Sequence, residues 1–296
     1  MQENSGWRFA PKVPSASEIG VSADFRHAPI CLCKTTFLFC MLMGMLILLL
    51  PRSLSAQTNC EDGNGPLDYT PPKTLSAQEV IQKFGAAEAL TKEARAHYTY
   101  KQDVLMQTLG GKNVTGEFHE VTTVSYDPKG RRQEEVTYAA QPSLRGIQLT
   151  QEDMDDIRVF MPLMLPSEDL PQYNLTYSGQ QHVDDLDTYV FHLEPKKEEK
   201  NRRYFIGRIW VDAQDFQIVK VCGKSGPDKI QVKRHERMDL HPTFVTYRQQ
   251  VDDRYWFPAY TRSDDTLAFK AGSVHVREII KYSNYKRVDG KMTGGQ

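Results

Sequence analysis

The chain has 296 residues, with 37 Lys and Arg side chains against 38 Asp and Glu, so its formal net charge is −1. This balance gives no general electrostatic reason to bind nucleic acid, and we expect no nucleic-acid partner. Charged residues make up 25% of the chain and hydrophobic residues 40%, which is typical of a folded globular protein and excludes disorder throughout. The length fits one domain with an N-terminal extension.

An uncharged apolar run lies near the N-terminus. It covers the 16 residues 35–50, follows Arg26 and Lys34, and precedes a group of small residues that ends at Ala56. A basic region, an apolar region and a small-residue ending are the parts of a secretory signal, which predicts export and cleavage after Ala56. The run is short for a membrane span, but an uncleaved anchor remains the alternative. We therefore predict that residues 1–56 are an N-terminal extension with a signal peptide or an inner-membrane anchor.

The cysteines divide at the predicted cleavage site. Cys31, Cys33 and Cys40 precede it, whereas Cys60 and Cys222 follow it. An oxidising compartment would permit a disulfide between Cys60 and Cys222. The alternative, a lipid-modified Cys60, would need a small residue in place of Asn59. The spacing of the cysteines and of the eight histidines indicates no zinc site.

Residues 57–73 are rich in Asn, Gly, Pro and Asp, which predicts a flexible linker. A helix is then expected to begin near Ser76, because Ser76 and Glu79 have the spacing of a capping box. One stripe of this helix is apolar or small, and its members are Val80, Phe84, Ala87, Thr91 and Ala94. A helix of this kind can lie close against a sheet.

Strands are expected at residues 97–109, 114–126 and 131–138, with turns at Gly110, Gly111 and residues 127–130. Consecutive strands with short turns favour an antiparallel meander over βαβ units. Further strands are expected at residues 173–179 and 189–195. The charged run at residues 196–203 is most simply a solvated hairpin tip, and a docking patch for an anionic membrane is the alternative.

Residues 150–165 interrupt the strands with a helical pattern. Thr150 and Asp153 have capping spacing, and the apolar surface comprises Met154, Ile157, Phe160, Met161 and Met164. Methionines beside an aromatic ring suit an adaptable lid over a lipid-like ligand. An ordinary amphipathic helix that closes the end of a barrel is the alternative.

Two tryptophan-containing hairpins follow. Residues 204–223 form the first, with a turn at residues 212–215, and residues 244–262 form the second, with a turn at residues 252–254. Both faces of each hairpin are largely apolar, so each face needs a cover or a ligand. Pro258 cannot donate to a strand ladder, which places its strand at an edge or at a bulge. The last strand puts Val274, Val276, Ile280 and Tyr282 on one face, and residues 290–296 are expected to be a loose tail.

The segments GRIWVDAQDFQIVKVCGK, YRQQVDDRYWFPAYTRSDD and VHVREIIKYSNYKR resemble the carboxy-terminal half of proteins in the bacterial outer-membrane lipoprotein carrier (LolA/LolB-like) superfamily. The resemblance covers residues 75–288. It implies a mainly β fold with α, in which a curved antiparallel half-barrel sheet (an unclosed barrel) has helices packed on its concave side. The half-barrel domain would then span residues 74–289.

The residues indicate no enzymatic chemistry. No metal-binding pair, calcium loop, G-x-S-x-G elbow, phosphate-binding loop or dinucleotide fingerprint is present in the sequence, so we expect no enzyme, no cofactor and no metal site. The resemblance instead implies an exported, periplasmic or envelope carrier that holds lipid or lipoprotein acyl chains in an apolar cavity. Candidate cavity residues are Phe84, Met154, Ile157, Phe160, Met164, Trp210 and Trp256. The alternative is a protein-interaction or envelope-stress sensor module that binds an envelope membrane protein, with an exposed edge at the strand that contains Pro258.

Overall fold

The computed structural model describes residues 58–61, 64–199, 202–227, 229–232, 235–238, 241–269 and 272–288. The chain divides into two units, Met1–Ser55 and Ala56–Gln296, and all of the described residues belong to the second. The predicted signal segment and the predicted tail lie outside them. Within the described part of the chain, no helix has the length and apolarity needed to cross a bilayer.

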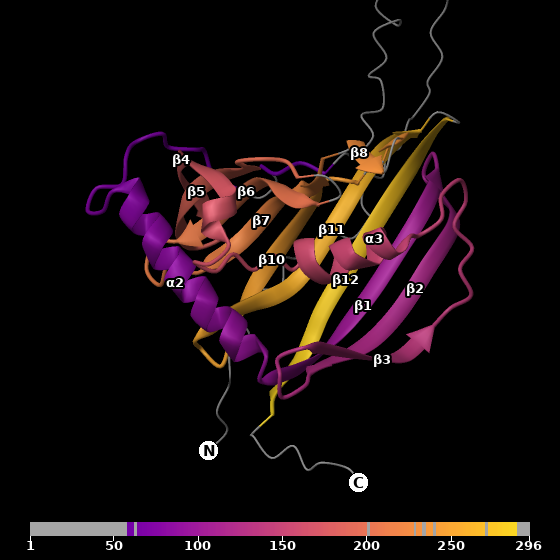
Figure 1. The fold of residues 1–296 in the computed structure, drawn as a ribbon, viewed down its shortest axis with the longest axis horizontal. Helices are drawn as coiled ribbons and strands as arrows, with labels where there is room; N and C mark the ends of the chain where they lie inside the picture. The colour runs from indigo at the N-terminus through magenta and orange to yellow at the C-terminus, as the bar shows by residue number, and fades with distance from the viewer. Residues whose placement is uncertain are drawn as a thin grey trace, which may run out of the picture. The chain divides into compact units, whose positions relative to one another are not determined.

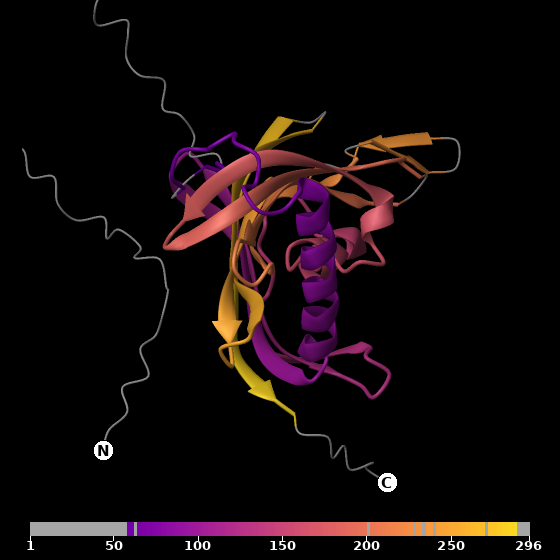
Figure 2. The ribbon, with the colours of Figure 1, turned by 90° about the vertical axis from the view of Figure 1, so that its left-hand side faces the viewer.

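Ten strands form one antiparallel sheet, which curves strongly around its concave side (Figures 1 and 2). Its order is β3-β2-β1-β12-β11-β10-β7-β6-β5-β4, so the end strands β3 and β4 do not pair and the barrel stays open. The strands are β1 Tyr98–Gly110, β2 Asn113–Tyr126, β3 Arg132–Ala139, β4 Tyr173–Val183, β5 Leu186–Pro195, β6 Tyr204–Asp212, β7 Ile218–Gly226, β10 Phe244–Val251, β11 Tyr255–Phe269 and β12 Gly272–Arg287. The strands β8 Lys229–Val232 and β9 His235–Met238 form a separate hairpin. The predicted open antiparallel half-barrel is confirmed.

Helical segments cover the concave side of the sheet (Figure 2). The long helix α2, Ala77–Arg95, begins with the predicted capping box, in which the Glu79 amide donates to Ser76 Oγ and the Ser76 amide donates to Glu79 Oε2. The second segment consists of α3, Gln151–Asp155, and one π-helical turn η1, Asp156–Phe160. It ends at Phe160, because Pro162 has no amide hydrogen to continue the helix. A 3-10 turn η2, Leu170–Gln172, leads into β4.

The sheet is apolar on both faces. The concave cluster joins α2 and η1 to the sheet through residues such as Phe84, Ile157 and Phe191, all at most 2% exposed. The convex cluster contains Val190, Trp210, Cys222 and Val245. The two apolar faces predicted for the tryptophan hairpins therefore both have a cover, and the covers differ.

The cover on the convex face is the segment of residues 58–61 and 64–68, which we call the strap. Its Cys60 forms a disulfide with Cys222 on β7, and Leu67 packs against the convex cluster. The Thr58 amide donates to the Asp264 carbonyl at 2.7 Å, and strand-type bridges join residues 64 and 68 to β4. The prediction of a flexible linker at residues 57–73 is wrong for the strap, because a disulfide and backbone hydrogen bonds fix it to the sheet.

Pro258 lies at a bulge in an interior strand. β11 pairs with β10 on one side and β12 on the other, and the register shifts where Arg248 pairs with Pro258. The bulge accommodates the missing amide hydrogen. The prediction of an exposed edge at this strand is wrong, because the edge strands of the sheet are β3 and β4.

Candidate ligand-binding site on the concave face

The structure separates the predicted cavity residues into two groups. Phe84 and Ile157 are buried in the concave cluster, and Met154 and Phe160 pack half-buried against it. Met164 is half-buried in the segment that follows η1. Trp210 and Trp256 belong instead to the convex cluster. Strand alternation explains this division, because Ile209 and Val211, the neighbours of Trp210, point to the concave side.

The convex tryptophans have protein partners. Trp210 is fully buried, and its Nε1 donates to Gln181 Oε1 at 2.7 Å. The Lys220 ammonium lies 4.7 Å from the centre of the Trp210 ring and donates to the Cys60 carbonyl at 3.1 Å. Trp256 Nε1 donates to Asp215 Oδ2 at 2.8 Å. These tryptophans therefore join the strap and the hairpin turns to the sheet, and we leave them out of the candidate site.

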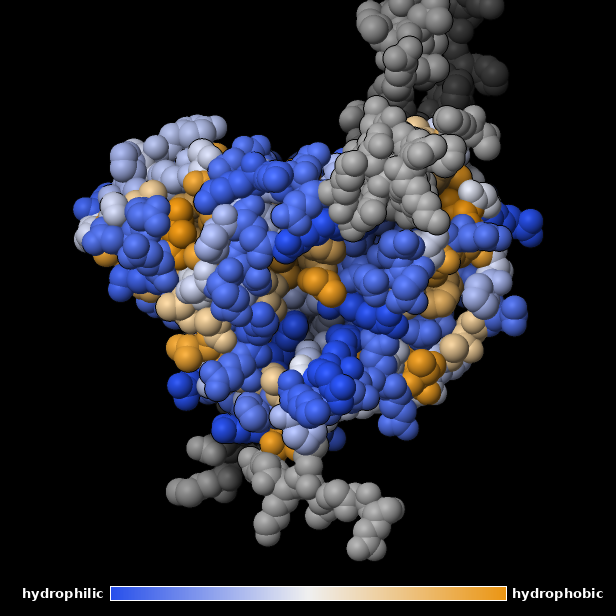
Figure 3. Space-filling view, in the orientation of Figure 1, coloured by the Kyte–Doolittle hydropathy of each residue, from blue (hydrophilic) through white to orange (hydrophobic). Residues whose placement is uncertain are grey.

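The concave face is incompletely covered. The surface that carries α2 and α3 is hollowed between these two helices (Figure 3). Around the buried concave cluster, apolar side chains of β2, β12 and the α3–η1 segment remain half-buried: Phe118, Tyr126, Met154, Phe160 and Tyr285. An apolar chain could replace water over these side chains without displacing the buried cluster.

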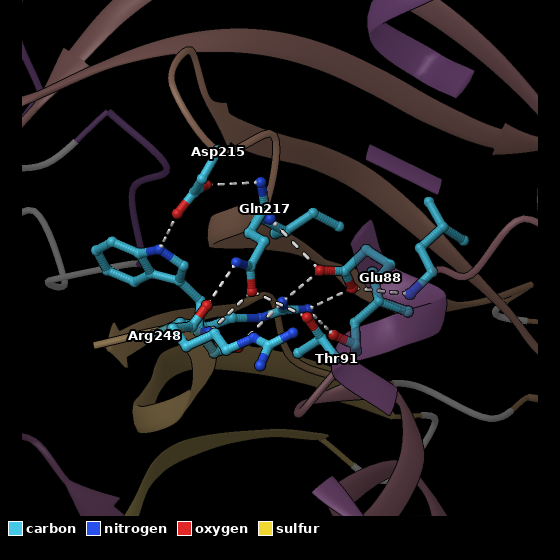
Figure 4. A network of polar contacts seen from close by, with 10 residues as sticks. Glu88, Thr91, Asp215, Gln217 and Arg248 are labelled. Carbon is cyan, nitrogen blue, oxygen red and sulfur yellow. Dashed lines mark hydrogen bonds and ion pairs between the residues drawn. The ribbon is translucent and has the colours of Figure 1, made fainter. Parts of the chain in front are cut away.

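A buried ion pair fixes α2 to the sheet (Figure 4). Glu88 and Arg248 have fully buried side chains, and both Arg248 Nη atoms donate to the carboxylate, at 2.7 and 2.9 Å. The Leu165 amide also donates to Glu88, at 3.1 Å, and Arg248 donates to the Leu163 carbonyl. One carboxylate thus joins the helix, β10 and the segment after η1.

Neutral polar groups extend this network to the hairpin turns (Figure 4). The Thr91 hydroxyl donates to Gln217 Oε1 at 2.9 Å, and the Trp256 amide donates to the same oxygen at 3.0 Å. Gln217 Nε2 donates to the Arg254 carbonyl at 2.8 Å. The second half of α2 is therefore held in a fixed position beside the candidate site.

Ion pairs and hydrogen bonds also hold the α3–η1 segment and the residues that follow it. Arg158 makes a two-pronged ion pair with Glu134 on β3, at 2.9 and 2.8 Å. The Thr246 hydroxyl donates to the Met161 carbonyl at 2.7 Å, and Gln102 reaches the Ile157 carbonyl at 3.5 Å. The segment is short and partly exposed, with Val159 58% accessible.

A buried acidic cluster lies beneath this segment. Glu278 on β12 is fully buried, and its carboxylate oxygens have no hydrogen-bond partner among the described residues. Burial, and then the charges of Asp153 and Asp156, raise the pKa of Glu278 to about 8, while His241 acts in the opposite direction. His241 Nδ1 lies 2.5 Å from Asp156 Oδ2. Glu278 is therefore protonated at neutral pH.

A separate cavity of about 380 Å³ lies between the second half of α2 and the turns of the two tryptophan hairpins. Its lining mixes apolar groups such as Leu90 and Tyr98 with the charged Glu93 and Arg254. This mixture suits an acyl chain less well than the concave face does. Within the described residues, no group of three or more His, Cys, Asp or Glu side chains is arranged to hold a metal ion.

Sequence reasoning missed two fully buried carboxylates, Glu88 and Glu278, although their positions gave a signal. Glu88 lies four residues after Phe84 and three before Thr91, on the buried stripe of α2. Glu278 lies midway between Val276 and Ile280, on the buried face of β12. A charged residue at a core position indicates a buried polar network.

No family model matches the chain, and no curated protein matches it. Several solved structures, however, match the chain. A DUF1329 family protein from Desulfovibrio piger is 14% identical over 70% of this chain and 95% of its own, with a TM-score of 0.33. A LolA superfamily protein from Nitrosomonas europaea is 15% identical over 74% of this chain and 96% of its own, with a TM-score of 0.31. A protein described as an outer membrane lipoprotein-sorting domain, from Vibrio parahaemolyticus, is 11% identical over 72% of this chain and 94% of its own, with a TM-score of 0.32.

Proposed function

We propose that the chain is a non-enzymatic envelope protein that holds acyl chains of a lipid or lipoprotein on its concave face. The observation that carries this proposal is the group of half-buried apolar side chains that pack against the concave cluster, on a face whose surface is hollowed between α2 and α3 (Figure 3). Each methylene buried there contributes about 0.8 kcal/mol. Roughly ten buried methylenes would therefore give a gross driving force of about 8 kcal/mol before the cost of ordering the chain is subtracted.

The α3–η1 segment is the lid in this proposal. It is ten residues long in all, from Gln151 to Phe160, and its Val159 is 58% exposed. Met154 and Phe160 face the concave cluster from it. A thioether beside an aromatic ring adapts to ligands of different shape, which suits a carrier that must release its cargo.

An oxidising compartment is part of the proposal. The disulfide between Cys60 and Cys222 closes the strap over the convex face. Such bonds persist in exported proteins and are rare in the cytosol. This supports a periplasmic or envelope location.

The test is native mass spectrometry of protein purified without detergent after expression of the full chain in a bacterial host, with solvent extraction in parallel. We expect an acyl-bearing adduct that is lost in Phe160→Asp, because a carboxylate would then face the acyl chain. The matched control is Val159→Asp, since Val159 is the exposed neighbour on the same turn. A clean ligand-free mass of the folded protein, or equal retention in both variants, would contradict the proposal.

The second candidate is a protein-interaction module, and the edge strand β3 favours it. β3 has a free edge, and its Val136 and Tyr138 are 53% and 50% exposed. An exposed edge can pair with a strand of a partner. Val136→Pro should then abolish capture of an envelope protein while lipid retention persists. If Val136→Pro leaves both the capture of the envelope protein and the retention of lipid unchanged, this candidate is contradicted.

A further inference from the structure

A positive charge lies at the end of α2, on the concave side of the sheet. Arg95 occupies the last turn of the helix, and its Nη1 is shielded from solvent without a hydrogen-bond partner. Among the residues that the structure describes, no carboxylate forms an ion pair with Arg95. Burial alone lowers the pKa of Arg95, but the neighbouring Tyr126 and Tyr100 raise it above its ordinary value. Arg95 is therefore charged.

The neighbours of Arg95 are tyrosines of β1, β2 and β12. Tyr100 stacks on Tyr285 with 5.1 Å between ring centres and lies 6.3 Å from Tyr282. Burial raises the pKa of Tyr100 to about 12, and it also raises the pKa values of Tyr282 and Tyr285. These hydroxyls stay neutral at physiological pH. The Tyr285 hydroxyl already donates to the Pro258 carbonyl at 2.8 Å, whereas the Tyr282 hydroxyl is shielded without a hydrogen-bond partner among the described residues. Neutral hydroxyls cannot neutralise a guanidinium.

The carboxylate that Arg132 joins to this group of tyrosines, Glu134, is already occupied. Arg132 donates to Glu134 at 2.7 Å, and Arg158 donates to both oxygens of the same carboxylate. Arg132 also donates to the Tyr100 hydroxyl, at 2.7 Å. Glu134 therefore serves two arginines and leaves the charge of Arg95 unmatched.

Arg95 is half-buried, and a guanidinium nitrogen that is shielded from solvent without a partner is costly, so a group from outside the chain is the natural partner. We propose that Arg95, with the surrounding tyrosine hydroxyls, binds the anionic head group of the amphiphile whose chain lies on the concave face. The proposal rests on the proposed function and deepens it, because it adds a carboxylate or phosphate to the ligand. A guanidinium suits such a group through charge-assisted, two-pronged hydrogen bonds. A free inorganic anion has the same chemistry and is the alternative source.

The test is binding of three probes to the full chain: dodecanoate, dodecan-1-ol and inorganic phosphate. We expect dodecanoate to bind about tenfold more tightly than dodecan-1-ol, as one charge-assisted contact predicts. Arg95→Gln should remove this preference and leave the affinity for dodecan-1-ol unchanged, which also shows that the variant is folded. Arg95→Lys should keep part of the preference. Lys92→Gln, which removes a charge from the exposed side of the same helix, should keep all of it.

The outcomes separate the two proposals. Equal affinities for dodecanoate and dodecan-1-ol in the wild-type chain would overturn the anion site and leave the carrier function in place. A preference that persists in Arg95→Gln would overturn the role of Arg95. If phosphate alone binds, and binds only when Arg95 is present, the anion site stands with a free anion as its ligand and the carrier function fails. Binding of none of the three would overturn both.

Discussion

Replacement of Glu278 by Gln should change how the stability of the protein depends on pH. The pKa of this carboxyl rises from 4.5 to about 8 in the folded protein, first because of burial and then because of Asp153 and Asp156. The folded state therefore holds the proton more tightly than the unfolded chain does. The stabilisation that the Glu278 proton gives to the folded state is complete below about pH 4.5 and is lost as the pH rises towards 8. At about 1.4 kcal/mol per pKa unit, the loss is at most about 5 kcal/mol.

The measurement is the free energy of unfolding from chemical denaturation between about pH 5 and pH 9. The amide in Glu278→Gln carries no charge at any of these values, so the two proteins should be about equally stable at the acidic end, and the variant should be several kcal/mol more stable at the alkaline end. Glu135→Gln, at an exposed position on β3, is the control and should follow the wild type. Parallel profiles for the wild type and Glu278→Gln would refute the reasoning.

Three further changes should be measurable by chemical denaturation. Glu88→Gln should lower the free energy of unfolding by about 3–5 kcal/mol because it leaves Arg248 buried without its counterion. Replacing both Glu88 and Arg248 by Met should lower it by less, and a larger loss in the double variant would contradict this account. Cys222→Ser should lower the free energy of unfolding by up to about 5 kcal/mol, because the disulfide to Cys60 closes a loop with a sequence separation of 162 residues. An unchanged stability under oxidising conditions would show that the disulfide does not hold the strap. Gly207→Ala should lower the free energy of unfolding by about 1–3 kcal/mol, because an added Cβ would overlap the carbonyl oxygen of Cys222 on the neighbouring strand. An unchanged free energy of unfolding would contradict that close approach.

Local features of the fold could be predicted from the sequence because their causes are local. The turn at residues 252–254 joins β10 and β11 as predicted, and Asp252 and Asp253 adopt the left-handed conformation that such turns need. The capping boxes at Ser76 and Thr150 both form. Each depends on residues three or four positions apart.

Features that depend on distant partners could not be predicted in the same way. The strap reads as a linker because it is polar and rich in Gly and Pro, and only its contacts with β4, β7 and β11 fix it. The candidate site was half predicted: alternation shows that Trp210 and Ile209 point to opposite faces, but it does not show which face carries α2. The partner of Glu88 lies 160 residues away, beyond the reach of any local pattern.

The pairing of β1 with β12 has a consequence for biogenesis. These strands lie side by side in the middle of the sheet, although one comes first in the sheet sequence and the other last. A chain that is made, or crosses a membrane, from its N-terminus must hold β1 with one side unpaired until its final strand arrives. Such late closure makes folding slow and exposes apolar edges in the meantime. The protein should therefore depend on a holding chaperone during synthesis or export more than a sheet built from successive hairpins would.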